Sequence, residues 1–457
     1  MTVDLTSPRH VHLVGIGGAG MSGIARVLLQ RGHTVSGTDL QEGRTLDELS
    51  AMGAVVSVGH DAEAVDGAEV VVVSAAVPDH NPEVEEAHRR GLPVYQRAEM
   101  LAALMSEATR VLVAGTHGKT TTTSMVVVGL QAAGLDPSYA VGGQLNETGS
   151  NAHAGSDDLF VAEADESDRS FLVFEPDLAI VTNVELDHPD EFEDDDQVQE
   201  AFTDFLGRRS PGGVAVICID DPGARALVSE IDEPIVTYGE DPSADVRLVV
   251  DDGGGAVVRR DGEWEVRLEL PAPGRHNLLN ATAALTAAAW AGVDPGEAAQ
   301  GLGSFAGPQR RFQRLGSAGG VEVVDDYAHH PTELRSTLAA ARSVTDGRVV
   351  LVVQPHRYSR TQALGEELGR AAAAADVVVV TEVYASSEDP IPGVTGRSVA
   401  EAAETAGARV IWEPHLAALP ERLAEVVQHG DLVLVTGAGD VTQVGPGLLD
   451  LLGDADD

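Results

Sequence analysis

The stretch best suited to chemistry is the glycine-rich turn Gly115-Thr116-His117-Gly118-Lys119-Thr120-Thr121. An apolar run precedes it at 111–114 and a helix-like run follows at 123–128, so the pattern predicts a strand, a turn and a helix start. That geometry points backbone N–H groups and a helix dipole at a phosphate. The match to the standard phosphate loop is imperfect, because Val113 stands where that pattern has glycine. A chance glycine-rich turn is therefore the alternative.

Lys119 is the only lysine of the chain, and the other 29 of its 30 basic residues are arginine. A compact ammonium on a flexible stem suits a β- or γ-phosphate better than a planar guanidinium does. This exception to the arginine bias favours a phosphate-binding role for Lys119.

A second glycine pattern, G-x-G-x-x-G, occupies 15–20 between a short strand and the helical run 24–30. Asp39 follows the second strand, where an acidic residue can accept a hydrogen bond from a ribose or another hydroxyl. The pattern suits NAD and a UDP-sugar equally well, and it makes Gly17, Gly18 and Asp39 candidate ligand residues. The strand 69–73 ends in a loop of small residues at the same expected sheet edge, which adds Ser74, Ala75 and Ala76.

Carboxylates follow two further strands. The strand 159–162 leads into Glu163-Ala164-Asp165-Glu166-Ser167-Asp168, and the strand 178–184 leads into Glu185-Leu186-Asp187-His188. We expect both ends at the sheet edge that carries the phosphate loop. Because Mg²⁺ takes oxygen ligands together with nucleotide phosphates, Thr120 and Glu163 are predicted to hold one ion, and His188 to reach a second. Solvation of surface acids is the alternative for any single carboxylate.

Asn277 and Asn280 lie three residues apart at an expected helix start, where two amides could bind an adenine edge. Capping of the helix by Asn277 is the alternative. Further on, strands predicted at 321–324, 349–353, 377–381, 410–412 and 432–436 alternate with helices. Three of them end in polar clusters, at 325–331, 354–360 and 437–440. A lone His or Arg there is usually structural, but three clusters at one sheet edge favour a ligand site.

The composition predicts a soluble α/β protein and excludes some partners. At 457 residues the chain is too long for one core, and we expect three domains at 1–109, 110–313 and 314–457. A net charge of −43 argues against nucleic acid or an anionic membrane as a partner.

The single cysteine, Cys218, excludes an intramolecular disulfide. The absence of a signal-like start and of a long apolar run predicts a cytoplasmic protein without membrane insertion.

Taken together, these segments resemble the Mur ligase family, the ATP-dependent ligases that add amino acids to peptidoglycan precursors, and within it the alanine-adding member. The resemblance covers nearly the whole chain in order, through the segments 15–21, 115–121, 163–168, 182–188, 276–280, 310–312, 325–331 and 354–361. It implies Rossmann-like doubly wound sheets at both ends of the chain, flanking a central phosphate-loop ATPase domain.

The resemblance also implies the reaction. The carboxylate of UDP-N-acetylmuramate would attack the γ-phosphate of ATP, and L-alanine would then displace phosphate from the acyl phosphate. Small molecules are thus the implied partners, namely ATP, UDP-N-acetylmuramate and L-alanine, with two Mg²⁺ ions for which Mn²⁺ is a substitute. The oligomeric state stays open.

The roles that the resemblance implies fall into five sets. Lys119, Glu163, His188, Arg311 and Asp326 would be catalytic. ATP would be bound by Gly115, Thr116, His117, Gly118, Lys119, Thr120, Thr121, Asn277, Asn280, Arg311 and Asp326. The metal ligands would be Thr120, Glu163 and His188. The UDP-sugar would contact Gly17, Gly18, Asp39, Ser74, Ala75 and Ala76. The amino acid would contact Tyr327, His329, Arg357 and Arg360.

Some relatives hold their second metal with a carbamoylated lysine, and this chain has no lysine except Lys119. We therefore expect a weaker second metal site that uses Glu163, His188 and water. Three alternatives stay open: a recycling ligase that joins UDP-N-acetylmuramate to a tripeptide, an NAD-dependent oxidoreductase, and a nucleotide-binding regulator without turnover.

Overall fold

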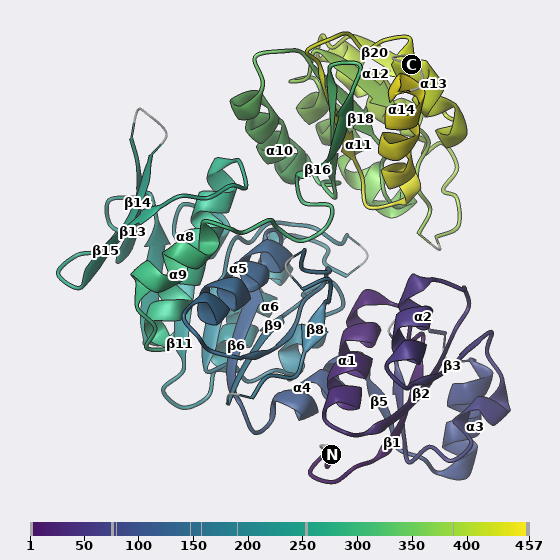
Figure 1. The fold of residues 1–457 in the computed structure, drawn as a ribbon, viewed down its shortest axis with the longest axis vertical. Helices are drawn as coiled ribbons and strands as arrows, with labels where there is room; N and C mark the ends of the chain where they lie inside the picture. The colour runs from purple at the N-terminus through teal and green to yellow at the C-terminus, as the bar shows by residue number, and fades with distance from the viewer. Residues whose placement is uncertain are drawn as a thin grey trace. The chain divides into compact units, whose positions relative to one another are not determined.

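The computed structural model describes residues 3–74, 77–78, 80–146, 148–156, 158–189, 191–251, 255–386 and 388–453 (Figure 1). These residues form three sheets of five, ten and six strands, with helices between the strands in the chain. The α/β fold predicted from the alternation of strands and helices is thereby confirmed. Among the described helices, none combines the length and the apolar character that a membrane crossing needs.

The first sheet is wholly parallel, with the order β3-β2-β1-β4-β5. This is the order of a doubly wound sheet, which reverses at β1, where ligands bind in such folds. Its strand β4 is a run of four buried valines, as expected for a strand covered on both faces. The elements are β1 His10–Val14, α1 Ala19–Gln30, β2 Thr34–Asp39, α2 Arg44–Ala51, β3 Val55–Val58, η1 Ala62–Val65, β4 Val70–Val73, α3 Pro82–Arg90, β5 Val94–Gln96 and α4 Arg97–Met105.

The second sheet has the order β15-β14-β13-β12-β11-β10-β6-β9-β7-β8. Its elements are β6 Thr109–Ala114, α5 Lys119–Ala132, β7 Ser138–Ala140, β8 Ala152–His153, β9 Leu159–Glu163, η2 Ser170–Val173, β10 Leu178–Val181, α6 Asp195–Gly207, β11 Val214–Cys218, α7 Pro222–Leu227, β12 Ile235–Gly239, β13 Val246–Val250, β14 Ala256–Arg260, β15 Trp264–Leu268, α8 Arg275–Trp290 and α9 Pro295–Leu302. Strand β6 pairs in parallel with both β9 and β10. The two acidic strand ends and the phosphate loop therefore share one sheet edge, as predicted.

The third sheet has the order β16-β17-β21-β18-β19-β20. Its elements are β16 Gln313–Ala318, β17 Val321–Asp326, α10 Pro331–Val344, β18 Val349–Val353, α11 Tyr358–Ala372, β19 Val377–Val380, α12 Gly396–Thr405, β20 Val410–Trp412, η3 Leu416–Ala418, α13 Leu419–Ala424, β21 Leu432–Thr436, η4 Asp440–Gln443 and α14 Val444–Gly453. All five predicted strands are present. The edge strand β16 was not predicted; it runs antiparallel to β17, and its exposed polar residues give no apolar run.

The chain divides into two compact units. One comprises Met1–Glu185, Asp196–Glu269 and Asn280–Phe305, and the other comprises Leu186–Asp195, Leu270–Leu279 and Ala306–Asp457. The first two sheets lie in the first unit, and the third sheet lies in the second unit. The boundaries at 109/110 and 313/314 stay predictions.

Helices α11 and α12 pack closely because α11 carries two buried glycines one turn apart. A Cβ atom on Gly369 would lie 2.4 Å from the Val399 carbonyl oxygen, which is too close. A Cβ atom on Gly365 would meet its neighbours at 3.4 Å or more, which is an ordinary contact.

We predict that Gly369→Ala destabilises the protein by about 1–3 kcal/mol, because helix α12 would have to shift. The matched variant Gly365→Ala should be neutral or stabilising by up to about 1 kcal/mol, since alanine favours the helix. Urea unfolding of both variants followed by circular dichroism checks the pair. Equal midpoints for the two variants would contradict the packing described here.

Candidate functional site

The phosphate loop has the backbone that its glycines predict. Gly115 follows β6 with φ +134°, and a Cβ atom there would lie 2.0 Å from the Thr182 hydroxyl oxygen. Gly118 caps α5 with φ +80°, in the left-handed region. Helix α5 then begins at Lys119, and its first amide groups have no partner within the helix. The turn therefore presents amide donors at a helix N-terminus despite Val113.

The segment after β10, at residues 182–185, is hydrogen-bonded to the phosphate loop. Its strand ends at Val181, three residues earlier than predicted, because the following residues bond to the loop instead of to a neighbouring strand. The Thr116 and His117 amides donate to the Asn183 backbone and side-chain oxygens at 3.1 and 2.7 Å. The Glu185 amide donates to the Thr116 hydroxyl at 3.0 Å. The loop conformation is thus fixed by neighbouring strand ends.

Lys119 is paired with Glu166. Its Nζ donates to both Glu166 carboxylate oxygens at 2.9 and 2.8 Å and to the Gly115 carbonyl at 2.8 Å, and Asp165 lies at 3.8 Å. Burial alone would lower the pKa of Lys119, but the carboxylates around it, with Glu166 foremost, raise that pKa. Burial and Asp165 raise the pKa of Glu166 to about 7. Lys119 therefore stays cationic.

Glu163 and Thr120, the two residues predicted to hold one Mg²⁺ ion, lie in contact with each other. The Thr120 hydroxyl lies 3.2 Å from Glu163 Oε2, and the Gly142 amide donates to Glu163 Oε1 at 2.6 Å. Two neighbouring oxygens in an octahedral Mg²⁺ shell lie about 3.0 Å apart, so this donor pair fits the ion. Burial, with Asp165 as a further cause, raises the pKa of Glu163. Three carboxylates thus face one ammonium, an excess of negative charge that a divalent cation would neutralise.

The glycine pattern of the first sheet is also assembled as predicted. The Gly17 amide donates to Asp39 Oδ2 at 2.9 Å, which brings the acidic residue onto the loop. A Cβ atom on Gly15 would lie 3.5 Å from the Ser74 Cβ, so Ser74 borders the same turn. Gly18 forms the N-cap of α1. Ala75 and Ala76 lie outside the described residues.

Asn277 and Asn280 are both buried in helix α8 and lie on one of its faces. Capping of the helix start by Asn277 does not occur, because Asn277 is the third helical residue. Its amide donates instead to the Pro273 carbonyl at 2.7 Å. A Cβ atom on Gly118 would lie 3.0 Å from Asn280 Oδ1, so Asn280 borders the phosphate loop.

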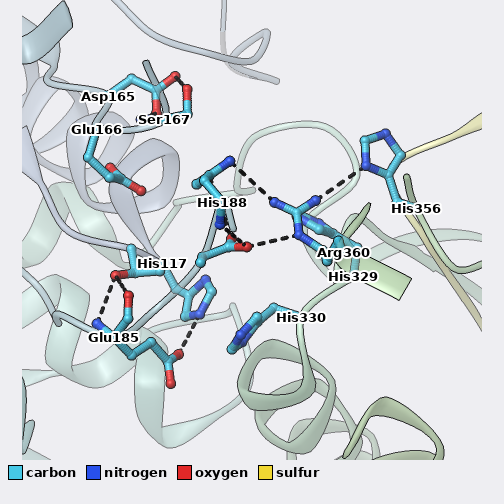
Figure 2. Close-up of polar contacts among 12 residues, drawn as sticks. His117, Asp165, Glu166, Ser167, Glu185, His188, His329, His330, His356 and Arg360 are labelled. Atoms are coloured by element: carbon cyan, nitrogen blue, oxygen red, sulfur yellow. Dashed lines mark hydrogen bonds and ion pairs between the residues drawn. The ribbon is translucent and has the colours of Figure 1, made fainter. Parts of the chain in front are cut away.

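Arg360 is the centre of a polar cluster in the second unit. Its guanidinium donates to Asp187 Oδ1 at 2.8 Å and contacts His356 Nδ1 at 3.3 Å and His188 Nδ1 at 3.5 Å (Figure 2). Both Arg360 and Asp187 are 5% exposed. Burial would raise the pKa of Asp187, but Arg360 together with the neighbouring histidines outweighs burial and holds that pKa well below its usual range.

His329 lies in the same cluster, and its proton can be assigned. Its Nδ1 lies 3.0 Å from the Tyr327 carbonyl, which can only accept, so Nδ1 carries the hydrogen of the neutral ring. Nε2 then holds a lone pair. Burial lowers the pKa of His329 to about 4, so the ring is neutral at pH 7. Its ring packs edge-on against those of Tyr327 and His356.

The remaining predicted residues make defined contacts. The Arg311 guanidinium lies 5.1 Å from the Tyr327 ring centroid and contacts Glu333 at 3.4 Å. Asp326 accepts from the Phe312 and Ala328 amides, and burial raises its pKa to about 6.

Arg357 has φ +66° before α11 and pairs with Glu388 at 2.9 Å. Glu163 and His188 belong to different units, so their sharing of an ion stays a prediction.

Several residues that the structure brings to these sites are not among those predicted from the sequence. Glu166 binds Lys119, Asn183 holds the phosphate loop, Asp187 holds Arg360, and His356 contacts Arg360. Glu166, Asp187 and His356 lie in the polar strand ends that the sequence singled out, which was the available signal, whereas Asn183 lies within the strand predicted at 178–184. Their roles depend on which side chains of each run point inward.

The three α/β sheets and the glycine-rich loop at 115–121 define a multidomain α/β protein of the phosphate-loop class. Three family models match the chain: the Mur ligase family catalytic domain over residues 10–109, the Mur ligase middle domain over residues 113–288 and the Mur ligase glutamate ligase domain over residues 310–439. The chain belongs to the Mur ligase family.

Individual relatives cover nearly the whole chain. A UDP-N-acetylmuramate–L-alanine ligase of Streptomyces coelicolor is 50% identical over 450 residues, covering 96% of this chain and 97% of that protein. The ligase of the same name from Mycobacterium sp. (strain JLS) is 48% identical over 460 residues, covering 96% and 94%. The crystal structure of UDP-N-acetylmuramate-alanine ligase from Thermotoga maritima is 28% identical, with a TM-score of 0.81 over 98% of this chain and 100% of that one.

We predict that Asp187→Asn destabilises the protein by about 3–5 kcal/mol at pH 7, because it leaves the Arg360 charge buried without its partner. The pKa of Asp187 is lowered on folding, so its stabilising effect is present above the unfolded pKa of about 3.9 and is lost as the pH falls below it. The difference between variant and wild type should therefore shrink in acid. Urea unfolding at pH 7 and pH 3 checks this.

The control is Glu367→Gln, which breaks the exposed pair of Glu367 with Arg335 in the same unit. It should change stability by only about 0–1 kcal/mol at either pH. An Asp187→Asn effect as small as that of the control would contradict a buried, charge-dependent pair.

Proposed function

We propose that this chain joins L-alanine to UDP-N-acetylmuramate with conversion of ATP to ADP and phosphate, in peptidoglycan precursor synthesis. The proposal rests on the relatives at 48–50% identity over 96% of the chain, which are named UDP-N-acetylmuramate–L-alanine ligase. The chemistry of the sites is compatible with it. The phosphate loop offers amides and one ammonium, and the cluster around Arg360 offers donors that suit an amino-acid carboxylate.

In the first step, a muramate carboxylate oxygen attacks the γ-phosphorus and the bond from the γ-phosphorus to the β-γ bridging oxygen breaks, which gives an acyl phosphate and ADP. Anions come together in this step. Lys119 and the loop amides would bind the β- and γ-phosphates and stabilise the charge of the transferring group. Asn277 and Asn280 would hold adenine, while Arg311 and Asp326 would contact the nucleotide.

Metal ions would supply further charge neutralisation on the phosphates. Thr120 and Glu163 fit the first Mg²⁺, and Glu163 with His188 would hold the second. We assign Glu166 the role of keeping Lys119 charged and oriented, since its carboxylate binds Nζ through both oxygens.

In the second step, the alanine nitrogen attacks the acyl carbon, the bond from carbon to the phosphate oxygen breaks, and phosphate leaves. The amine must lose a proton. His329 fits this task, because its ring is neutral at pH 7 and its Nε2 carries the lone pair. Arg357 and Arg360 would bind the alanine carboxylate, with Tyr327 beside it.

The UDP part would lie on the first sheet. Gly17, Gly18 and Asp39 fit a diphosphate at a helix N-terminus with a carboxylate near a hydroxyl, and Ser74, Ala75 and Ala76 complete this set. The domains 1–109, 110–313 and 314–457 would thus bind the UDP-sugar, ATP and the amino acid, respectively.

We predict that phosphate release from ATP requires both UDP-N-acetylmuramate and L-alanine, and that Lys119→Ala lowers its rate by about 10²–10³-fold or more. Lys119→Arg should restore little of this activity, because a planar guanidinium does not replace the ammonium. The measurement is phosphate release with Mg²⁺ and a panel of amino acids. Turnover only with a tripeptide would instead identify a recycling ligase, and an NADH absorbance change would identify an oxidoreductase.

A second prediction concerns the metal. Glu163→Gln should raise the Mg²⁺ concentration for half-maximal activity at least tenfold, because it removes an anionic ligand. In the wild type this concentration should fall as the pH rises through the raised pKa of Glu163, since the carboxylate must lose its proton to bind the ion. The control is Glu200→Gln on the exposed face of α6. Equal Mg²⁺ curves for both variants would remove Glu163 from the metal site.

A further inference from the structure

A chain of buried polar side chains crosses one face of the first sheet. His12 and Ser36 are paired neighbours on β1 and β2, and Thr38 follows Ser36 on the same face. His12 Nδ1 lies 2.8 Å from Ser36 Oγ. His12 and Thr38 are 1% exposed, and Ser36 is 7% exposed. Buried polar groups on a sheet face require hydrogen-bond partners, and these side chains find them in one another and in helix α3.

Glu83 is the centre of the cluster. It is the second residue of α3, is fully buried, and receives three side chains from other elements. His12 Nε2 lies 2.8 Å from Oε2, His60 Nδ1 lies 2.8 Å from Oε1, and the Thr38 hydroxyl lies within 2.9 Å of both oxygens. Burial would raise the pKa of Glu83, but these hydrogen bonds outweigh burial and lower it. The carboxylate is therefore ionised and accepts all three bonds.

The cluster is joined to the glycine loop through Thr38. While the Thr38 hydroxyl donates to Glu83, its carbonyl accepts from the Gly15 and Ile16 amides at 2.8 and 2.9 Å. The next residue, Asp39, accepts from the Gly17 amide. The conformation of the loop therefore depends on where Thr38 is held.

His60 extends the same arrangement to the third strand. It follows β3, and the preceding Gly59 amide donates to the Asp39 carbonyl at 2.8 Å. One carboxylate on α3 thus bonds to β1, to the end of β2 and to the turn after β3. The end of β2 bonds directly to the glycine loop, and the turn after β3 bonds to that strand end.

We propose that Glu83 is a positioning residue for the nucleotide-sugar site: it holds Thr38 and His60 and thereby sets the glycine loop that receives the diphosphate. This inference rests on the proposed function, since it takes UDP-N-acetylmuramate as the ligand of the loop. Glu83 acts through Thr38 and His60. Its loss should therefore weaken binding of the UDP-sugar without changing the ATP site.

The test is calorimetric binding of UDP-N-acetylmuramate to Glu83→Gln and Thr38→Val, together with KM and kcat. A glutamine places an amide donor among side chains that already donate, and the valine removes only the hydroxyl. Both variants should raise the Kd and the KM for the UDP-sugar about tenfold, with kcat and the KM for ATP within twofold. Thr38→Ser restores the hydroxyl and should restore binding.

The matched control is Glu48→Gln in the same sheet region, which breaks the contact of Glu48 with the buried Arg26 at 2.6 Å. Thermal midpoints are measured for all variants. The control should lower the midpoint and leave the Kd for the UDP-sugar unchanged.

The Kd values and thermal midpoints of these variants distinguish a positioning role from a purely structural one. Lower midpoints with wild-type Kd values in Glu83→Gln and Thr38→Val would overturn the inference and leave Glu83 a purely structural residue. An equal rise in the KM for ATP would also overturn it. If Glu83→Gln does not fold, the comparison of Thr38→Val with Thr38→Ser decides. A wild-type protein that fails to bind UDP-N-acetylmuramate would refute the proposed function itself.

Discussion

The ion pair of Lys119 with Glu166 sets the electrostatics on which the phosphate loop depends. One ammonium faces three buried or half-buried carboxylates, and two of these have raised pKa values. Such a site is short of positive charge. A phosphate can enter only if cations accompany it, so the nucleotide and its metal belong together by simple charge balance.

The polar cluster of the second unit has a different charge balance, set by Arg360, Asp187 and histidines. Around Arg360 burial lowers the pKa values of His329 and His356, and one buried carboxylate, Asp187, balances the guanidinium. This environment suits a zwitterion, because it offers arginine donors to a carboxylate and a neutral ring to an ammonium. The two clusters follow the same plan, in which polar residues end buried parallel strands.

Much of the fold and part of the candidate site could be predicted from the sequence. Glycine spacing after a strand predicted both loops, and strand-end acids predicted that Glu163 would lie at the sheet edge of the phosphate loop, where it contacts Thr120. The spacing could not tell which acid of the run 163–168 would pair with Lys119, because that depends on which residue the chain buries. The polar bonds of Thr38 and Glu83 gave no signal either, since they join residues 45 positions apart. The edge strand β16 was missed because its sequence, Gln313–Ala318, contains no apolar run.

The arginine bias of this chain has a practical side. Its side chains offer one primary amine, and that amine is mostly buried and hydrogen-bonded in the phosphate loop. Acylating reagents that modify lysine therefore have a single side-chain target, whose reactivity depends on how often the pair with Glu166 opens. The rate of that modification is a reporter of the loop, built into the protein without any engineered label.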